Sequence, residues 1–115
     1  MPLDHVALTV SDRDRSAAFY GEHFGLSTRV HDDEHLLIIR RRRRLAACPL
    51  RRRSGRRGPP PHHHFGFRLA DRDAVLAARE RFQAAGVTEL EWQDHGPARV
   101  QVADPDGYRV EVYAF

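Results

Sequence analysis

The chain has 115 residues, of which 41% are hydrophobic, and a formal net charge of +3 at pH 7. A chain of this length fits one compact domain, which buries about two-thirds of the surface that the unfolded chain exposes. The single cysteine excludes an internal disulfide, and residues 1–10 lack the basic start and the long apolar run of a signal peptide or membrane span. We therefore expect a cytoplasmic protein without membrane contact, folded as a single domain over residues 1–115.

The positive charge is concentrated in one segment. Residues 40–57 hold ten arginines and no acidic residue, so the rest of the chain carries a net charge of −7. No aromatic residue lies among these arginines to stack on nucleic-acid bases. The segment therefore indicates a solvated charged loop followed by a proline-rich linker, and we expect no nucleic-acid partner.

The chain begins with the pattern of a half-buried strand. Apolar and polar residues alternate over residues 3–10, and successive side chains of a strand point to opposite faces. One face is predicted to join the core, and the other to face a polar environment. The first consists of Val6, Leu8 and Val10, and the second of His5, Ala7 and Thr9.

A helix is predicted to follow this strand. Asp12 is a typical N-cap, and Gly25 suits the left-handed conformation that ends many helices. Between them Ala17, Tyr20 and Phe24 recur at helical spacing and predict a buried face. Two strands are then expected at residues 26–30 and 35–40, joined by a turn at residues 32–34.

The second half of the chain repeats this order. A strand at residues 64–69 leads to the cap Asp71 and to a helix that ends at Ala85, before Gly86. The predicted buried face of this helix consists of Val75, Ala78, Phe82 and Ala85. Strands are expected at residues 87–92, 99–103 and 109–113, with an Asp-Pro-Asp-Gly turn at residues 104–107. Each half thus predicts a βαβββ module, about residues 1–58 and 62–115.

The fourth strand of the first half has the weakest pattern. Only residues 45–50 interrupt the arginine runs with apolar side chains. Because proline lacks an N–H for the strand ladder, Pro49 is expected to place this strand at a sheet edge, or itself at a strand end.

The two halves place a histidine at equivalent positions. His5 and His64 each head a predicted strand, and Glu111 faces the same way on the last strand. Two neutral imidazoles and one carboxylate make a three-ligand site for a divalent metal and leave positions open for substrate or water. Two alternatives stay open: Glu111 lies on the solvent side of an edge strand, or a one-residue register slip makes His62 or His63 the ligand.

Further polar side chains share this face. Arg68, Arg99 and Arg109 offer planar guanidinium groups that pair with a carboxylate or a phosphonate, although each also fits an ordinary surface ion pair. Thr9 is a candidate substrate contact, and Tyr113 is a candidate hydrogen-bond donor or acid that also fits a packing role.

Four motifs of this chain resemble the vicinal oxygen chelate superfamily, which includes glyoxalase I, extradiol dioxygenases and the bleomycin-binding proteins. They are Leu3-Asp4-His5-Val6, Phe19-Tyr20 through Phe24-Gly25-Leu26, His64-Phe65-Gly66-Phe67, and Asp104-Pro105-Asp106-Gly107 through Val110-Glu111-Val112. The resemblance covers nearly the whole chain except residues 40–61. It implies an α+β fold in which two βαβββ modules form an eight-stranded, mixed, curved sheet around an open cavity.

The resemblance also implies a ligand set and an assembly. The family's metal positions carry over to His5, His64 and Glu111, and in short members the site is commonly shared between the two subunits of a homodimer. A fourth family position would fall near Cys48, where a buried apolar role is the simpler interpretation. The metal can be iron, manganese, zinc or nickel.

Two functions follow from the resemblance. The first is a metal-dependent lyase, isomerase or dioxygenase, with Glu111 and Tyr113 as catalytic residues, acting on a small anionic oxygenated substrate. The second is a metal-free protein that sequesters a drug or metabolite. The second needs an aromatic-lined cleft, for which the sequence offers only Trp92, Phe65 and Tyr108, with Phe65 directed to the core.

Overall fold

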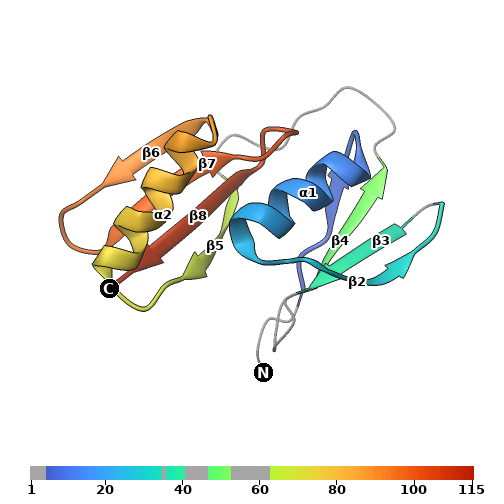
Figure 1. The fold of residues 1–115 in the computed structure, drawn as a ribbon, viewed down its shortest axis with the longest axis horizontal. Helices are drawn as coiled ribbons and strands as arrows, with labels where there is room; N and C mark the ends of the chain where they lie inside the picture. The colour runs from blue at the N-terminus through green and yellow to red at the C-terminus, as the bar shows by residue number, and fades with distance from the viewer. Residues whose placement is uncertain (1–4, 35, 41–46, 53–62) are drawn as a thin grey trace. The chain divides into compact units, whose positions relative to one another are not determined.

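The computed structural model describes residues 5–34, 36–40, 47–52 and 63–115, with the backbone alone for residues 47–52. The chain divides into two compact units, residues 1–56 and residues 57–115 (Figure 1). Each unit is described by itself. Neither helix of the described residues is long and apolar enough to cross a membrane.

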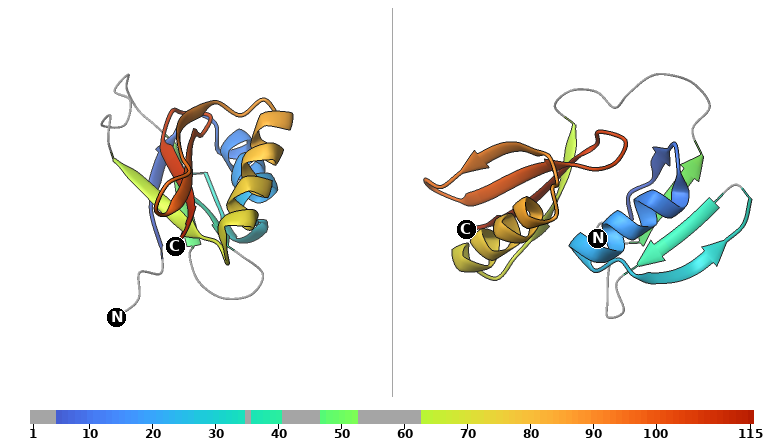
Figure 2. Two further views of the ribbon diagram at one scale, coloured as in Figure 1. Left: turned by 90° about the vertical axis from the view of Figure 1, so that its left-hand side faces the viewer. Right: turned by 45° about the horizontal axis from the view of Figure 1, so that its top comes forward.

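The first unit is a four-stranded sheet with one helix. Its elements are β1 (Leu8–Val10), α1 (Arg13–Phe24), β2 (Thr28–Asp32), β3 (Leu36–Arg40) and β4 (Ala47–Arg52). The strand order is β1-β4-β3-β2, in which β1 and β4 run parallel and the other pairs run antiparallel. Helix α1 lies against one face of this sheet (Figures 1 and 2).

The second unit repeats this topology. Its elements are β5 (His64–Arg68), α2 (Arg72–Ala84), β6 (Glu89–Gln93), β7 (Ala98–Ala103) and β8 (Arg109–Ala114). The strand order is β5-β8-β7-β6, in which β5 and β8 run parallel and the other pairs run antiparallel. The predicted α+β class and the two βαβββ modules are therefore confirmed, and each module has its own mixed sheet.

The helix starts match the sequence prediction. The Asp12 carboxylate accepts a hydrogen bond from the Arg15 N–H at 3.0 Å, and the Asp71 carboxylate accepts one from the Ala74 N–H at 2.8 Å. Each carboxylate satisfies an N–H that has no partner inside its helix, as an N-cap does.

The helix ends explain two differences from the prediction. Leu26 N–H donates to the Tyr20 carbonyl at 3.1 Å, and Val87 N–H donates to the Phe82 carbonyl at 2.9 Å. These N–H groups close the ends of the helices instead of pairing with a neighbouring strand, so β2 and β6 begin two residues later than predicted. Ala85 lies beyond the last turn of α2 and is exposed, so its predicted place on the buried face is wrong.

The core follows the predicted alternation. Leu8 and Val10 are buried, whereas His5, Ala7 and Thr9 are exposed. In the second unit the valines of β7 and β8 are buried together with the apolar face of α2: Val100, Val102, Val110, Val112, Val75, Ala78 and Phe82. The opposite face of this second sheet is left for polar side chains.

The predicted edge position of the proline strand is wrong. Strand β4 lies between β1 and β3, and Pro49 is opposite Ile38 in the middle of the strand. The pairing with β1 begins only at Leu8 and Leu50, one residue after the proline. Pro49 thus lies outside these three residue pairs, so its missing N–H does not interrupt them, which explains why an interior strand accepts it.

Candidate functional site

The register of the second sheet brings the predicted site residues onto one face. Glu111 on β8 lies opposite Gly66 on β5 and opposite Gln101 on β7. The same pairing sets Arg99 opposite Tyr113, and His64 opposite Arg109. The predicted site residues His64, Arg99, Arg109, Glu111 and Tyr113 are therefore neighbours across the three adjacent strands β5, β8 and β7.

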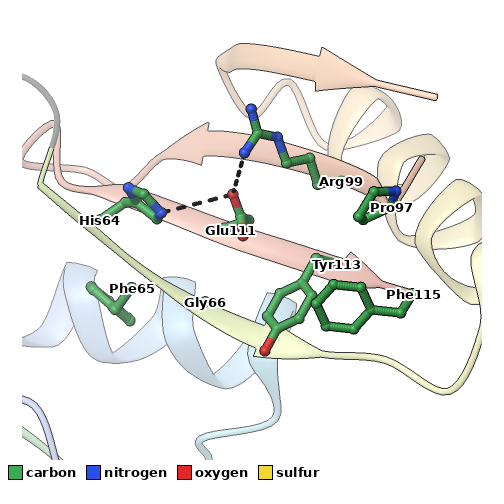
Figure 3. Close-up of a pocket in the computed structure, with 8 residues that line it drawn as sticks. All are labelled: His64, Phe65, Gly66, Pro97, Arg99, Glu111, Tyr113 and Phe115. Atoms are coloured by element: carbon green, nitrogen blue, oxygen red, sulfur yellow. Dashed lines mark ion pairs between the residues drawn. The ribbon is translucent and has the colours of Figure 1, made fainter. Parts of the chain in front are cut away.

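A cavity of about 390 Å³ opens on this face. Figure 3 shows it between β5, β8 and the start of β7. Eight residues line it: His64, Phe65, Gly66, Pro97, Arg99, Glu111, Tyr113 and Phe115. Its volume is in the range of small-molecule sites in proteins.

Glu111 is the buried acid of this cavity. Its side chain is 11% exposed, and its Oε2 atom lies 3.9 Å from His64 Nε2 and 4.0 Å from Arg99 Nη1. The same oxygen accepts a hydrogen bond from Gln101 Nε2 at 2.9 Å. Figure 3 shows His64 and Arg99 approaching the carboxylate from two sides. A carboxylate held among these groups keeps its negative charge balanced within a largely buried site.

Gln101 is not one of the site residues predicted from the sequence. Gln101 is buried, with 4% exposure, and its Oε1 accepts a hydrogen bond from Arg109 Nη1 at 3.2 Å. Because arginine can only donate, the amide oxygen must face Arg109 and the amide nitrogen must face Glu111. Arg109 therefore acts on the site through Gln101 and does not line the cavity. The alternation of β7 places Gln101 on this face but does not reveal the two hydrogen bonds.

Arg99 is held by a second acid that the sequence did not single out. Its Nη2 group donates to the Glu91 carboxylate on β6. Glu91 is opposite Gln101, just after a pairing irregularity between Glu89 and Glu91. At this irregularity β6 has one residue more than β7 between successive pairs, which changes the side chains that share a face. The simple alternation of β6 therefore could not identify the pair of Arg99 and Glu91.

The two predicted metal ligands of this unit fit a shared ion. Metal bonds to imidazole nitrogen and to carboxylate oxygen are each about 2.0–2.2 Å long, so two ligands of one tetrahedral ion lie about 3.4 Å from each other. His64 Nε2 and Glu111 Oε2 are 3.9 Å apart, so a side-chain shift of about half an ångström brings them to this spacing. Gln101 supplies the hydrogen bond that ligating carboxylates usually receive from a neighbour.

The third predicted ligand, His5, lies in the other unit. His5 and Thr9 are exposed on the polar face of the first strand segment. Within the described ranges, no three side chains of histidine, cysteine, aspartate or glutamate gather closely enough to hold a metal. Residues 53–62, which include His62, lie outside the described part; His64, not His63, lines the cavity.

The aromatic residues of the site differ from those expected. Trp92 lies under the Arg79 guanidinium, 4.4 Å from ring centroid to carbon, and is not part of the cavity lining. Tyr108 follows the turn at Asp104, whose carboxylate accepts its N–H at 2.8 Å. Of the three expected aromatic residues, Phe65 alone lines the cavity, together with Tyr113 and Phe115. In Figure 3 the Phe65 side chain points away from His64 and Glu111, as strand alternation predicts.

The remaining arginine of the face contacts one of these rings. The Arg68 guanidinium carbon lies 5.5 Å from the centre of the Phe115 ring, and Arg68 does not line the cavity. Of the three predicted anion contacts, only Arg99 therefore reaches the cavity.

A search of curated proteins gives no match. Among solved structures, the chain is similar to a lactoylglutathione lyase from Agrobacterium tumefaciens, with a TM-score of 0.78, 25% identity, and coverage of 98% of this chain and 92% of that one. A possible glyoxalase from Bacillus cereus gives a TM-score of 0.83 and 23% identity, with 97% of each chain covered. An antibiotic binding protein from a Streptomyces species gives a TM-score of 0.75 and 20% identity, with coverage of 99% and 95%.

A family model extends this likeness to the sequence itself. The model described as Glyoxalase/Bleomycin resistance protein/Dioxygenase superfamily matches residues 2–112. Because this match spans nearly the whole chain, including both βαβββ modules, the chain belongs to the Glyoxalase/Bleomycin resistance protein/Dioxygenase superfamily.

Proposed function

We propose that this protein is a metal-dependent enzyme, a lyase, isomerase or dioxygenase, that acts on a small anionic oxygenated substrate. One observation carries the proposal. The imidazole of His64 and the largely buried carboxylate of Glu111 face each other at 3.9 Å beside the cavity, a separation that one divalent ion can bridge. A divalent ion held there would supply Lewis-acid stabilisation of a negatively charged substrate oxygen.

The proposed ligands are His5, His64 and Glu111. Because His5 belongs to the first unit, the proposal requires a neighbouring first unit to complete the set, and we propose that it comes from the partner in a cytoplasmic homodimer. The exposed Thr9 would enter the site with His5 as a substrate contact.

The other residues of this chain would orient the reactants. Gln101 holds the Glu111 carboxylate, and Arg109 fixes the direction of the Gln101 amide. Arg99 is the proposed contact for a substrate anion, whereas Arg68 supports the Phe115 ring from outside the cavity.

Glu111 and Tyr113 are the proposed catalytic residues. The Tyr113 ring lines the cavity, and Figure 3 shows its hydroxyl group on the side away from Glu111. A role as acid therefore requires the reacting atom to lie beyond the ring. Tyr113→Phe removes only this hydroxyl and measures its contribution to turnover.

Elemental analysis of the purified protein tests the proposal. We expect one tightly held transition metal, lost in His64→Ala and in Glu111→Ala. His95→Ala is the matched control, because His95 is exposed in the second unit and is not part of the cavity lining. Retention of the metal by both site variants would contradict the proposed ligand set.

One observation favours a second function, sequestration of a small molecule without metal. Tyr113 and Phe115 line the cavity together with Phe65, so the aromatic surface that such binding needs is larger than the sequence predicted. A protein that takes up no metal after reconstitution, yet binds a small ligand, would favour this function over the enzyme.

A further inference from the structure

The cavity of the second unit has two chemically different ends. His64, Glu111 and Arg99 form a charged end, whereas Tyr113 and Phe115 form a ring end (Figure 3). A ligand that uses both ends must carry a polar group and an apolar body. The volume of about 390 Å³ is near the lower limit for ligand sites and restricts that body to one or two rings.

Arg99 is the group of the charged end that can receive an anion. A guanidinium has five N–H donors, and within the described residues the hydrogen bond of Arg99 to Glu91 uses only Nη2. Nη1 of Arg99 is 4.0 Å from Glu111 Oε2, which is beyond hydrogen-bond distance. The Arg99 side chain is 34% exposed. Donors of Arg99 thus remain for a ligand oxygen.

The other two arginines of this face, Arg68 and Arg109, already contact other side chains. Arg109 donates to Gln101 at 3.2 Å, and Arg68 lies over the outer ring, 5.5 Å from its centre. Neither of them lines the cavity. An anion that enters the cavity is therefore directed to Arg99.

The ring end is shaped by a glycine. A Cβ atom at Gly66 would lie 3.3 Å from Tyr113 Cε1 and 3.4 Å from Glu111 Cβ. The absence of a side chain at this position lets the Tyr113 ring lie across β5. Tyr113 and Phe115 then meet edge to face, with centroids 5.6 Å apart and planes at 80°. Phe115 is 82% exposed, so its ring retains surface for a further contact.

We propose that this cavity binds a small aryl carboxylate, with the carboxylate on Arg99 and the aromatic ring against Tyr113 and Phe115. The planar carboxylate matches the guanidinium fork, and a third ring adds an aromatic contact to the existing pair. The inference rests on the proposed function, because both use the same cavity. The nearby Glu111 charge weakens anion binding, so a divalent cation at His64 and Glu111 is expected to strengthen it.

Calorimetric titration of the full chain with benzoate tests this inference. Acetate is the probe with the charge but no ring, and benzamide is the probe with the ring but no charge. We expect benzoate to bind at least about tenfold more tightly than benzamide, because benzamide lacks the charged hydrogen bond, and about twofold to tenfold more tightly than acetate, because acetate lacks the ring. Equal affinities for benzoate and acetate would overturn the inference.

Three variants assign the two ends. Arg99→Met should lower benzoate affinity to the level of benzamide, and Phe115→Leu should reduce the preference for benzoate over acetate about twofold to tenfold. Arg81→Met is the control, because Arg81 is exposed on α2 and does not line the cavity. Unchanged benzoate binding in Arg99→Met would overturn the placement of the carboxylate.

The titrations are run on metal-free protein and again with added Zn²⁺. Benzoate binding by a protein that takes up no Zn²⁺ after its addition would refute the proposed enzyme and support this inference. Metal binding without any benzoate binding would do the reverse. The two ideas therefore fail separately.

Discussion

The two units have the same backbone topology but different side chains at the positions of the candidate site. Both sheets have the same strand order, both helices begin at an aspartate cap, and the second strand of each sheet has a pairing irregularity at the same place. That irregularity lies between Arg29 and His31 in β2, and between Glu89 and Glu91 in β6. The duplication inferred from the sequence thus extends to details of hydrogen bonding.

The difference lies on the face opposite the helix. When the two units are aligned so that His5 corresponds to His64, Leu8 corresponds to Phe67. Leu8 is paired with Leu50 and Phe67 with Val112, so Leu50 corresponds to Val112. One residue earlier along the last strands, Pro49 takes the position of Glu111. Cys48 then takes the position of Val110, so the fourth family position of the first unit falls on the proline and not on the cysteine.

The neighbouring strand shows the same contrast. Ile38, opposite Pro49, takes the position of Gln101, and Leu36 takes that of Arg99. The first unit thus has apolar residues where the second has the amide and the guanidinium of the site. Apolar alternation on the core side is enough to specify the fold, which leaves the other face free to differ between copies. The proposed chemistry is therefore concentrated in the second unit, and the first contributes only His5 and Thr9.

The largest expected effect tests that contribution. His5→Ala and His64→Ala homodimers should each lose the metal, but a mixed dimer of the two variants should regain one metal per dimer. In a shared site, the His5 of one subunit meets the His64 and Glu111 of the other, so the mixed dimer contains one intact ligand set. Metal content of the purified mixed dimer, with a different affinity tag on each chain, gives the measurement.

Two results would break the comparison in different ways. If His5→Ala keeps its metal, the first unit supplies no ligand. If the mixed dimer stays empty although both parents are folded, the ligand set lies within one chain.

A smaller effect is expected from the buried amide that only the second unit has. Gln101→Leu removes the hydrogen bond to Glu111 and frees Arg109, so metal affinity should fall about 10-fold to 100-fold, as for other outer contacts of metal ligands. Competition with a chromophoric chelator measures the affinity. Gln83→Leu is the control, because Gln83 is exposed on α2. An unchanged affinity would show that the carboxylate does not depend on Gln101.

The sequence predicted the elements better than the site. The caps Asp12 and Asp71 and the turn at residues 104–107 depend on interactions within a few residues, so local patterns suffice. The contact of Arg99 with Glu91 requires the strand register, including an irregularity that alternation does not reveal. The interior position of Pro49 likewise depends on where the ladder of a neighbouring strand ends.

The two caps should give equal and moderate effects if the units are equivalent. Asp12→Ala and Asp71→Ala each remove one hydrogen bond to an otherwise unpaired helix N–H, which typically costs about 1 kcal/mol. The expected decrease in Tm is about 4 °C for each variant. Glu80→Ala is the control, because Glu80 is exposed within α2. A decrease in only one variant would show that the units differ in stability as well as in chemistry.

The smallest expected effect concerns the arginine that starts each helix. Arg72 pairs with both oxygens of Asp94 at 2.8 and 2.7 Å, whereas Arg13 contacts the Asp33 carbonyl and lies 3.7 Å from the Asp32 carboxylate. The hydrogen bond from Arg72 holds the pKa of Asp94 below its usual value. Since that pKa is lowered in the folded state, the pair stabilises the fold above about pH 4 and loses its effect as the pH falls through the folded pKa.

Asp94→Asn should therefore lower Tm slightly at pH 7, in the small range of exposed ion pairs. The deficit should shrink as the pH is lowered from about 4, because the wild-type carboxylate then becomes protonated as well. Thermal unfolding of the wild type and of Asp94→Asn across this pH range gives the measurement, and a deficit of Asp94→Asn that stays constant with pH would contradict the assigned charge pairing.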